Sequence, residues 1–523
     1  MKKPLFFLFL ILFQGIYFGN NITAQYQNVM ITNTGSPNEP AICINPKNTN
    51  QLVAGSNLNF YYYSTNSGLN WTKATLTSTY SVWGDPAITV DTAGNFYYGH
   101  LTNPGSSYFI DRIVVQKSTN GGMNWSNGSF AGYIPPKQQD KEWLCVDPYN
   151  NNIYMTWTQF DRYGSSDPND SSVILFSSST NAGESWSNAL RISKKAGNCV
   201  DEDGTTEGAV PCTGPNGEIY VSWSIDEKIV FNKSTDGGIS WLPEETLVTV
   251  QPGGWDFGVE GIYRANGMPI TSCDLSNGPN RGTIYINWSD QRNGVTDTDV
   301  FFIKSTDGGN TWSTVKRVND DPAGKQQFFT WMTIDQTSGN LYFVYYDRRN
   351  YTTLQTDVFM AKSTDGGETF DNFKVSATPF TPNSSVFFGD YTNVTAADNK
   401  VRPIWARMDN TTMSLYTAIV DIKTNIQVLN SSEPASFKLY ANYPNPFNPK
   451  TKIKFDVANK LNGNLKVTIY DIDGKEIGKL VDQNLESGTY EVEWDGSAFA
   501  SGTYFCKMET GNFTDTISLV LIK

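Results

Sequence analysis

Carboxylates recur just before the segments that we expect to be the first strand of each repeat in this chain. These residues are Glu39, Asp85, Glu142, Glu207, Glu260 and Asp390. Carboxylates that lie close together raise one another's pKa, which suits a cation site or a set of general acids and bases. The alternative is that each carboxylate accepts hydrogen bonds from backbone N–H groups at a strand start and locks neighbouring repeats together.

Arginines follow the second strand that we expect in several repeats. These are Arg162, Arg292, Arg348, Arg349 and Arg407. A guanidinium group binds a carboxylate through two parallel hydrogen bonds, so these residues are candidate binding groups for an acidic ligand. Asp161, Asp290 and Asp347 stand close to four of the arginines in sequence, and an Asp–Arg pair within each loop is the alternative.

Histidine and cysteine usage limits the chemistry of the chain. His100 is the only histidine, which excludes zinc sites with several histidines, and we expect it to be structural, at a strand end. None of the six cysteines forms a Cys-x-x-Cys motif; Cys199 and Cys212 can pair in an oxidising compartment, and the others are expected to be buried thiols. Residues 201–204 and 296–299 are rich in oxygen and allow calcium, but a solvated loop is favoured, and no metal site is predicted.

The composition is that of an exported, loop-rich, all-β protein. Of 523 residues, 14% are aromatic and only 17% are charged, and the net charge is −13. A nucleic-acid-binding protein needs a basic footprint, so this class is excluded. Lys2 and Lys3 precede an apolar run at residues 5–13, and Ala24 suits cleavage, which predicts a signal peptide over residues 1–24. No other apolar run approaches the roughly 20 residues of a membrane helix.

An octapeptide with the pattern Ser-Thr-Asp/Asn-x-Gly-x-x-Trp/Phe occurs six times. The copies lie at residues 64–71, 118–125, 179–186, 234–241, 305–312 and 363–370. The Asp or Asn side chain can accept hydrogen bonds within its own turn, and glycine takes a positive φ. The pattern therefore predicts a tight turn between two strands, closed by the aromatic side chain.

These octapeptides resemble the Asp-box repeats of sialidases and related β-propellers, and the resemblance covers roughly residues 26–430. It implies a propeller over residues 25–430, with seven blades or alternatively six. Seven units can be aligned, with first strands that include Ala41–Ile44, Ala87–Val90, Ile262–Tyr263 and Thr392–Val394. The segment Gln27–Thr32 is expected to complete the last blade.

The resemblance also implies a site on the face opposite the Asp boxes. Sialidases use a tyrosine nucleophile with a glutamate base, an aspartate acid and three arginines, which places Tyr391, Glu260 or Glu207, Asp85 and the arginines above as candidates. Trp331 and other aromatic residues before first strands are candidates for stacking on sugars. The family's first-strand Arg-Ile-Pro is absent here, where residues 38–42 read Asn-Glu-Pro-Ala-Ile.

The C-terminal region, residues 431–523, has the alternation and Asp-Gly turns of a small β-sandwich. Its Tyr-Pro-Asn-Pro-Phe-Asn-Pro block at residues 443–449 closely resembles the type A sorting domain of the type IX secretion system. This resemblance implies the type IX secretion machinery as a partner and a secreted or surface-attached protein.

Two functions follow from these patterns. The first is a secreted or cell-surface propeller that binds extracellular glycan or protein ligands. The alternative is an exo-sialidase-like glycoside hydrolase with a tyrosine nucleophile. The missing first-strand arginine favours binding. Arginines that converge on Tyr391 would favour the hydrolase, and arginines that pair with neighbouring aspartates would favour the binder.

Overall fold

The computed structural model describes residues 26–103, 105, 109–421, 427–458, 465–483, 485–497, 499–511 and 513–523. The described residues form strands and turns and include no α-helix, so the all-β prediction is confirmed. Accordingly, no helix in these ranges is suited to crossing a membrane. The predicted signal peptide, residues 1–24, lies outside the described residues.

Residues 26–421 form seven four-stranded antiparallel sheets. The first sheet contains β2 (Ala41–Ile44), β3 (Leu52–Ser56), β4 (Phe60–Ser64) and β5 (Thr72–Thr75), and the second contains β6 (Ala87–Val90), β7 (Phe96–Leu101), β8 (Ile113–Ser118) and β9 (Ser129–Ala131). The third sheet contains β10 (Gln138–Val146), β11 (Ile153–Phe160), β12 (Ser172–Ser179) and β13 (Leu190–Arg191). The fourth sheet contains β14 (Glu207–Thr213), β15 (Ile219–Ile225), β16 (Lys228–Ser234) and β17 (Thr246–Val250). The fifth sheet contains β20 (Ile270–Cys273), β21 (Ile284–Asp290), β22 (Asp299–Ser305) and β23 (Lys316–Arg317). The sixth sheet contains β24 (Gln327–Asp335), β25 (Asn340–Asp347), β26 (Asp357–Ser363) and β27 (Asp371–Lys374). The seventh sheet contains β28 (Asn393–Ala397), β29 (Lys400–Asp409) and β30 (Thr412–Asp421), together with β1 (Gln27–Thr32).

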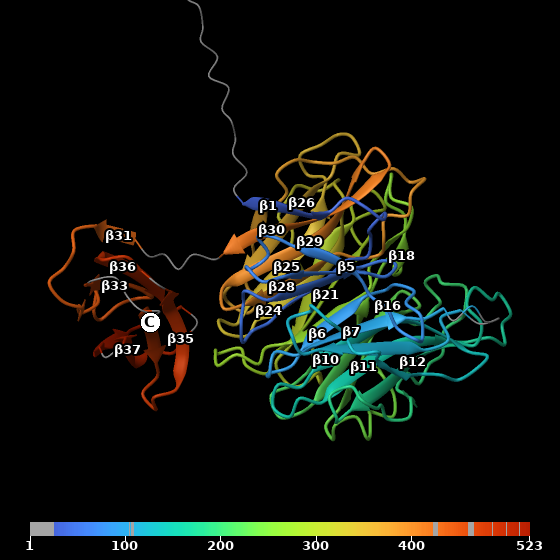
Figure 1. The fold of residues 1–523 in the computed structure, drawn as a ribbon, viewed down its shortest axis with the longest axis horizontal. Coiled ribbons are helices and arrows are strands. Elements are labelled where there is room, and N and C mark those ends of the chain that lie inside the picture. The colour runs from blue at the N-terminus through green and yellow to red at the C-terminus, as the bar shows by residue number, and fades with distance from the viewer. Residues whose placement is uncertain are drawn as a thin grey trace, which may run out of the picture.

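The sheets form a closed ring, which is the larger of the two bodies in Figure 1. The first strand of each sheet contacts the first strand of the next, in the order β2, β6, β10, β14, β20, β24 and β28, and β28 returns to β2. β1 pairs antiparallel with β30, with Gln27 opposite Ile419 and Thr32 opposite Leu415. The N-terminal strand therefore completes the seventh sheet and joins the two ends of the ring.

Each octapeptide joins the third and fourth strands of a sheet. In the fifth sheet the Asp307 carboxylate accepts hydrogen bonds from the N–H groups of Asn310 (3.0 Å) and Thr311 (2.9 Å). Gly309 has a φ of +81°, and a Cβ there would come within 2.4 Å of the Phe231 ring in the preceding sheet. The Trp312 ring packs edge-on against the same Phe231 at 5.3 Å. Each turn thus fastens its sheet to the one before it.

The fifth sheet differs from its prediction. Its first strand is β20, whereas the predicted segment Ile262–Tyr263 lies in the connection before it, beside the small hairpin of β18 (Asp256–Phe257) and β19 (Ala265–Asn266). This connection is longer than the others, and its apolar residues have the same sequence pattern as a strand. The prediction was wrong because the pattern does not distinguish a buried connection from an inner strand.

His100 is a buried structural residue of β7. Its Nδ1 lies 2.7 Å from the Leu101 carbonyl oxygen, and its Nε2 lies 3.2 Å from Gln116 Oε1. Burial lowers the pKa of His100 to about 4, although both hydrogen bonds oppose this shift.

We expect His100 to make the propeller sensitive to acid. The folded-state pKa lies below that of the unfolded chain, so stability is lost as the pH falls from about 6.5 through about 4, by up to about 3 kcal/mol. His100→Gln should flatten this part of the stability profile in urea titrations. Because the chain has one histidine, its imidazole NMR signal can be followed directly, and a midpoint near 6.5 would contradict the prediction.

The six cysteines are all free, so Cys199 and Cys212 do not form the pair that an oxidising compartment would allow. Cys199 is buried beside the loop after β11, where its backbone forms an isolated antiparallel β-bridge with that of Ser165. Cys212 is half-buried on β14, and with Cys43 and Cys145 it lines an axial cavity of about 590 Å³. Small side chains suit these positions because seven strands converge there.

The C-terminal residues form a second body with two four-stranded sheets (Figure 1). One contains β31 (Gln427–Asn430), β32 (Lys438–Leu439), β33 (Lys450–Val457) and β36 (Gly488–Asp495), and the other contains β34 (Leu465–Tyr470), β35 (Glu476–Gln483), β37 (Gly502–Thr510) and β38 (Phe513–Leu521). Their facing side chains, including Phe455, Tyr490 and Trp494, form a separate core. β31 pairs with β36, so the sandwich includes residues that precede the predicted boundary at 431.

Candidate functional site

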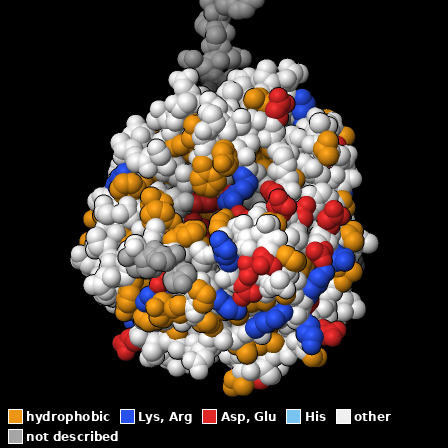
Figure 2. Space-filling model, turned by 90° about the vertical axis from the view of Figure 1, so that its right-hand side faces the viewer, with side chains coloured by type: hydrophobic (Ala, Val, Ile, Leu, Met, Phe, Trp, Pro, Cys, Tyr) orange, Lys and Arg blue, Asp and Glu red, His pale blue; other side chains and the backbone are white. Residues whose placement is uncertain are grey.

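The starts of the inner strands, the loops between second and third strands, and the connections between sheets all lie on one face of the ring. This follows from the antiparallel order, which places the octapeptide turns on the opposite face. Figure 2 views the molecule from the side on which β18 lies in Figure 1. Acidic and basic side chains gather near the middle of this face, among hydrophobic ones.

A buried lysine stands among carboxylates at the mouth of the central channel. Lys141 Nζ lies 3.0 Å from Asp85 Oδ2, 3.1 Å from Asp390 Oδ2 and 3.9 Å from Glu39 Oε1. These carboxylates come from the starts of three other sheets, and the carboxylate of Glu39 also accepts a hydrogen bond from the amide of Asn57. The acidic surroundings raise the pKa of Lys141 well above its usual range, although burial opposes them. Lys141 is therefore a fixed cation.

Arg264 extends the cluster from the connection before β20. Its Nε donates to Asp390 Oδ1 at 2.9 Å, and its Nη1 donates to Asp201 Oδ2 at 3.0 Å. The Tyr163 hydroxyl donates to the same Asp201 oxygen at 2.7 Å. Burial alone would raise the pKa of Asp390, but Lys141 and Arg264 hold it below its usual range. Asp390 therefore stays ionised as the common partner of both cations.

A recurring backbone conformation positions these side chains. Glu39, Asp85 and Lys141 have φ values of 48°, 52° and 54°, and Phe329 has a φ of 50° at the corresponding point of β24. In the third, fourth and sixth sheets the pairing of the first two strands shifts at this point, as it does in a β-bulge. A bulge re-aims side chains, so Asp140 and Lys141 need not alternate across the strand. Each left-handed non-glycine residue costs on the order of 1–3 kcal/mol, which the surrounding contacts must offset.

Several buried polar atoms at the mouth have no hydrogen-bond partner among the described residues. They are both carboxyl oxygens of Glu142, Oε1 of Glu207 and the hydroxyl of Tyr391. Burial, followed by the charge of Asp85, raises the pKa of Glu142 well above its usual range. Burial, followed by the charge of Asp201, does the same for Glu207. These shifts favour the protonated, neutral forms of the carboxyl groups, which can both donate and accept hydrogen bonds.

Asp140 is an acid of the mouth whose pKa lies near neutrality. Burial, with the charges of Asp85 and Asp201, raises the pKa of Asp140 to about 7, although Lys141 opposes the shift. A carboxyl group with this pKa can give and take a proton near neutral pH. The mouth as a whole holds seven carboxyl groups and two cations, which are Glu39, Asp85, Asp140, Glu142, Asp201, Glu207 and Asp390 with Lys141 and Arg264.

Three aromatic rings close the channel below the charged cluster. The Trp143 ring lies 4.6 Å from Trp331 and 5.1 Å from Tyr391, and Trp331 lies 6.3 Å from Tyr391. Trp331 was expected at the mouth as a stacking surface for sugars, but it is 8% exposed and packs in this plug. The bulge of β24 turns it into the channel. Burial, followed by Asp85 and Glu39, raises the pKa of Tyr391 well above its usual range, so Tyr391 is a neutral phenol.

Three of the predicted arginines pair with an aspartate two residues away in the chain, and Arg407 lies within β29 rather than after its strand. Arg292 donates to Asp290 (Nε–Oδ1 2.9 Å), Arg349 to Asp347 (Nε–Oδ2 2.8 Å) and Arg407 to Asp409 (Nε–Oδ2 2.9 Å). Arg292 and Arg349 also lie over the rings of Phe301 and Phe359, each at 4.3 Å. Their guanidinium groups are thus engaged within their own sheets.

The other two arginines lie in different surroundings. Arg348 is buried; its Nε donates to Thr356 Oγ1 at 3.0 Å and its Nη1 donates to the Glu260 carbonyl oxygen at 2.8 Å. Arg162 is exposed in the loop after β11. The five arginines therefore do not form one binding cluster with Tyr391.

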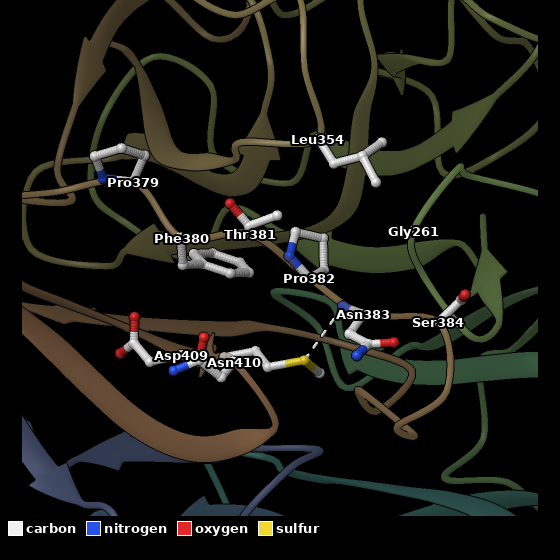
Figure 3. A pocket seen from close by; sticks show the side chains of 11 residues that line it. Gly261, Leu354, Pro379, Phe380, Thr381, Pro382, Asn383, Ser384, Asp409 and Asn410 are labelled. Carbon is white, nitrogen blue, oxygen red and sulfur yellow. Dashed lines mark hydrogen bonds between the residues drawn. The ribbon is translucent and has the colours of Figure 1, made fainter.

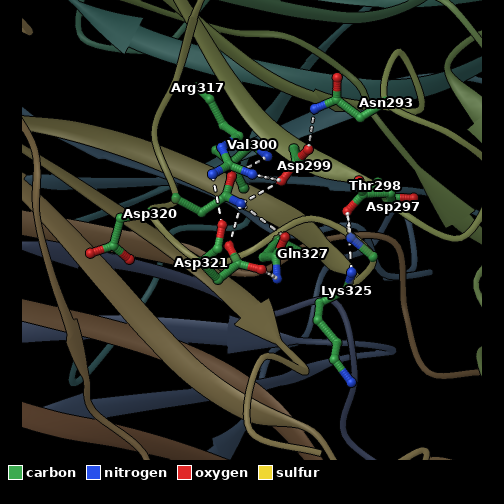
Figure 4. Close-up of polar contacts among 12 residues, drawn as sticks. Asn293, Asp297, Thr298, Asp299, Val300, Arg317, Asp320, Asp321, Lys325 and Gln327 are labelled. Atoms are coloured by element: carbon green, nitrogen blue, oxygen red, sulfur yellow. Dashed lines mark hydrogen bonds and ion pairs between the residues drawn. The ribbon is translucent and has the colours of Figure 1, made fainter. Parts of the chain in front are cut away.

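The oxygen-rich segment 296–299 belongs to a hydrogen-bonded network between the fifth and sixth sheets, shown in Figure 4. Asp297 Oδ1 accepts from the N–H groups of Gly324 (2.6 Å) and Lys325 (3.1 Å). Asp299 accepts from Asn293 at 2.6 Å and from Arg317 at 3.3 Å. These carboxylate oxygens thus already accept hydrogen bonds from other groups of the protein. In the described ranges, no group of three or more His, Cys, Asp or Glu side chains is arranged to hold a metal ion.

Of the predicted carboxylates, Glu39, Asp85, Glu142, Glu207 and Asp390 lie at the starts of inner strands. Glu260 is the exception: it is exposed and contributes its carbonyl oxygen to Arg348, because the connection before β20 displaces it from the strand start. Sequence reasoning missed Asp140, Lys141 and Arg264. The run Asp140-Lys141-Glu142 was a usable signal, since three adjacent charges at a strand start are unusual in a chain with 17% charged residues.

The strand topology confirms the predicted all-β propeller. Solved structures that are similar to this chain include two sialidases and a polysaccharide lyase. The Hadza microbial sialidase Hz136 is 14% identical, with a TM-score of 0.41, over 72% of this chain and 75% of its own. The NanB sialidase of Streptococcus pneumoniae is 10% identical, with a TM-score of 0.42, over 64% of this chain and 68% of its own. A PL25 ulvan lyase is 11% identical, with a TM-score of 0.46, over 76% of this chain and 96% of its own. No curated protein matches the chain.

The C-terminal sandwich has a direct family match. Residues 441–523 match the secretion system C-terminal sorting domain, and they include the Tyr-Pro-Asn-Pro-Phe-Asn-Pro block. Phe447 of this block is buried in the sandwich core, and its backbone forms an isolated parallel β-bridge with Leu521 of the last strand. The chain therefore ends in a secretion system C-terminal sorting domain, which directs type IX secretion to the cell surface or the extracellular space.

Proposed function

We propose that this exported propeller binds an uncharged extracellular glycan at the mouth of its central channel. The observation that carries the proposal is the charge arrangement on this face. Arg292, Arg349 and Arg407 are neutralised by aspartates two residues away in the chain, and the mouth holds an excess of carboxyl groups around Lys141. Both cations of the mouth are already paired with carboxylates, so an acidic sugar finds no free cation there, whereas carboxyl groups form hydrogen bonds with sugar hydroxyls.

Aromatic side chains on the same face support a sugar ligand. Trp83, two residues before Asp85, is 40% exposed. Tyr263, next to Arg264, is 62% exposed, and its ring contacts Phe387 edge-on at 5.9 Å. A mouth with acidic hydrogen-bonding groups and exposed rings combines the polar and apolar contacts that small-molecule sites use.

The test compares matched glycans on the full-length protein. Neutral oligosaccharides and the same oligosaccharides capped with sialic acid are titrated by calorimetry. We expect binding of at least one neutral glycan and about tenfold weaker binding of its sialylated form. Preference for the capped form would overturn the proposal, and binding of peptides with no glycan binding would point to a protein ligand instead.

A glycoside hydrolase that works through carboxyl groups is the second candidate, favoured by Asp140. Its pKa of about 7 suits a general acid, which would lose activity as the pH rises above about 7. If neutral aryl glycosides are hydrolysed, we expect Asp140→Asn to lower kcat about 100-fold or more. Asp167→Asn, in the exposed loop after β11, is the control and should change little. An active Asp140→Asn variant would exclude this role.

The exo-sialidase alternative has its own test. Hydrolysis of a fluorogenic sialoside by the full chain, abolished by Tyr391→Phe, would establish a sialidase with an unusual arrangement of arginines. We expect no turnover above that of buffer, because the arginines do not converge and Tyr391 is a neutral phenol without an activating partner.

A further inference from the structure

We infer that a groove beside the mouth binds the continuation of the same glycan, so that the ligand is an extended uncharged chain rather than a single terminal sugar. This inference rests on the proposed function and adds the class of ligand. The groove has a volume of about 510 Å³, within the range of about 300–1,000 Å³ that is common for ligand pockets. Figure 3 shows the side chains that line it.

The walls of the groove come from segments far apart in the sequence. Leu354 lies in the loop between β25 and β26, Asn410 in the turn between β29 and β30, and residues 379–384 in the connection between the sixth and seventh sheets. Gly261 has a φ of +80°, and a Cβ there would come within 2.9 Å of Leu354 Cδ1. Because loops and connections of this kind lie on the face of the mouth, the groove opens on the same face.

The lining matches the chemistry of a neutral sugar chain. Leu354, Pro379 and Phe380 are apolar, and Figure 3 shows them along the groove with polar side chains between them. Thr381, Ser384 and Asn410 are exposed, and none of their side chains has a hydrogen-bond partner among the described residues. They can therefore donate to and accept from sugar hydroxyls, while the half-buried side chains of Leu354 and Pro379 contact C–H groups.

The groove carries no unpaired charge. Asp409 is the only charged residue in its lining, and both of its carboxylate oxygens accept hydrogen bonds from Arg407, each at 2.9 Å. An acidic ligand would find no cation in this lining, and a basic ligand would have to compete with Arg407 for Asp409. The groove also offers no free strand edge along which a peptide backbone could pair, because its walls are built from loops and turns. An uncharged oligosaccharide is the occupant that fits both facts.

The groove is joined to the mouth through two segments. The segment that supplies residues 379–384 continues to Phe387, whose ring contacts Tyr263 at 5.9 Å and faces the Arg264 guanidinium at 5.6 Å. Arg264 in turn binds Asp390 in the charged cluster. Gly261 of the groove lies two residues before Tyr263. A chain seated in the mouth can thus pass over the Tyr263 and Phe387 rings into the groove.

The experiment measures how affinity depends on chain length in the full-length protein. Xylo-, cello- and manno-oligosaccharides from monosaccharide to hexasaccharide are titrated by calorimetry. For the series that binds, we expect the hexasaccharide to bind about tenfold or more tightly than the disaccharide. Ser384→Trp, which fills the groove from an exposed position, should remove this gain and leave the disaccharide affinity unchanged. Thr353→Trp is the matched control, since Thr353 is exposed in the same region but does not line the groove.

The outcomes separate this inference from the proposed function. Binding that does not depend on length, or a gain that survives in Ser384→Trp, would overturn the groove while leaving glycan binding at the mouth intact. The absence of binding to every neutral oligosaccharide and polysaccharide would overturn both. A thermal midpoint of Ser384→Trp equal to that of Thr353→Trp verifies that any loss of affinity does not come from unfolding.

Discussion

Replacing Lys141 by methionine is expected to lower the free energy of unfolding of the propeller by about 3–5 kcal/mol. Lys141 Nζ contacts Asp85 at 3.0 Å and Asp390 at 3.1 Å, and its side chain is 9% exposed. Methionine has a similar length but no charge, so the change leaves buried carboxylates without their cation. An uncompensated buried charge costs more than the original pair contributed, which makes this the most damaging single substitution that we expect at the mouth.

The measurement is a urea titration followed by tryptophan fluorescence. All but one of the 14 tryptophans precede residue 427, so this signal reports the propeller. The matched control is Lys195→Met in the same propeller, where the lysine that pairs with Asp226 has a side chain that is 53% exposed. An exposed pair contributes at most about 1 kcal/mol, so the control should change little.

The pH dependence of the Lys141→Met deficit distinguishes lost charge from lost packing. Without Lys141, the pKa of Asp390 should rise, because one of the two cations that lower it is gone. The deficit should therefore shrink as the pH falls and the carboxylates become protonated. A deficit that stays constant with pH would show that packing, rather than charge, is responsible, and a loss below 1 kcal/mol would contradict the role given to Lys141.

Removing β1 is expected to open the ring and to destabilise the propeller by about 4–5 kcal/mol or more. A mature chain that begins at Asn33 loses the ladder between β1 and β30 and the buried side chain of Ile31. It also loses the hydrogen bonds of the Asn28 amide, which donates to the Val375 carbonyl oxygen at 2.8 Å and accepts from the Ala377 N–H at 2.7 Å. β30 then becomes an unprotected edge strand, which favours association between chains.

Size-exclusion chromatography and thermal unfolding check this expectation. We expect oligomers or aggregates and a lower midpoint for the truncated chain. A synthetic peptide with the sequence of residues 26–34 should restore the monomer and raise the midpoint, because it can add the missing strand to the sheet. A scrambled peptide is the control. A truncated chain that remains monomeric and melts like the intact protein would show that β1 does not close the ring.

Much of the architecture could be predicted because its signals are local. The six octapeptides identify turns through their own hydrogen bonds and glycines, as the turn at Asp307 and Gly309 shows. Alternating apolar residues locate most inner strands, including Ala41–Ile44 and Ala87–Val90. The prediction failed at Ile262–Tyr263, where an apolar connection has the same local pattern as a strand.

The site could be predicted only in part, because its geometry depends on contacts between distant segments. The carboxylates at strand starts were found, since position along a strand is a local property. Their shared partner Lys141 was missed, because a β-bulge turns its side chain into the mouth. Arg264 was missed because it belongs to an irregular connection that contacts Asp390 from 126 positions away.

The sequence by itself determined the repeat, the turn chemistry and the sorting domain at the C-terminus, and it left the number of blades as seven or six. Only the tertiary structure decided how the charges are paired. Arg292 faces Asp290 rather than Tyr391, and Trp331 packs in the channel rather than at its mouth. The physical reason is that turns and strand periodicity arise from neighbours in the chain, whereas pairing of charges depends on which strand starts converge when the ring closes.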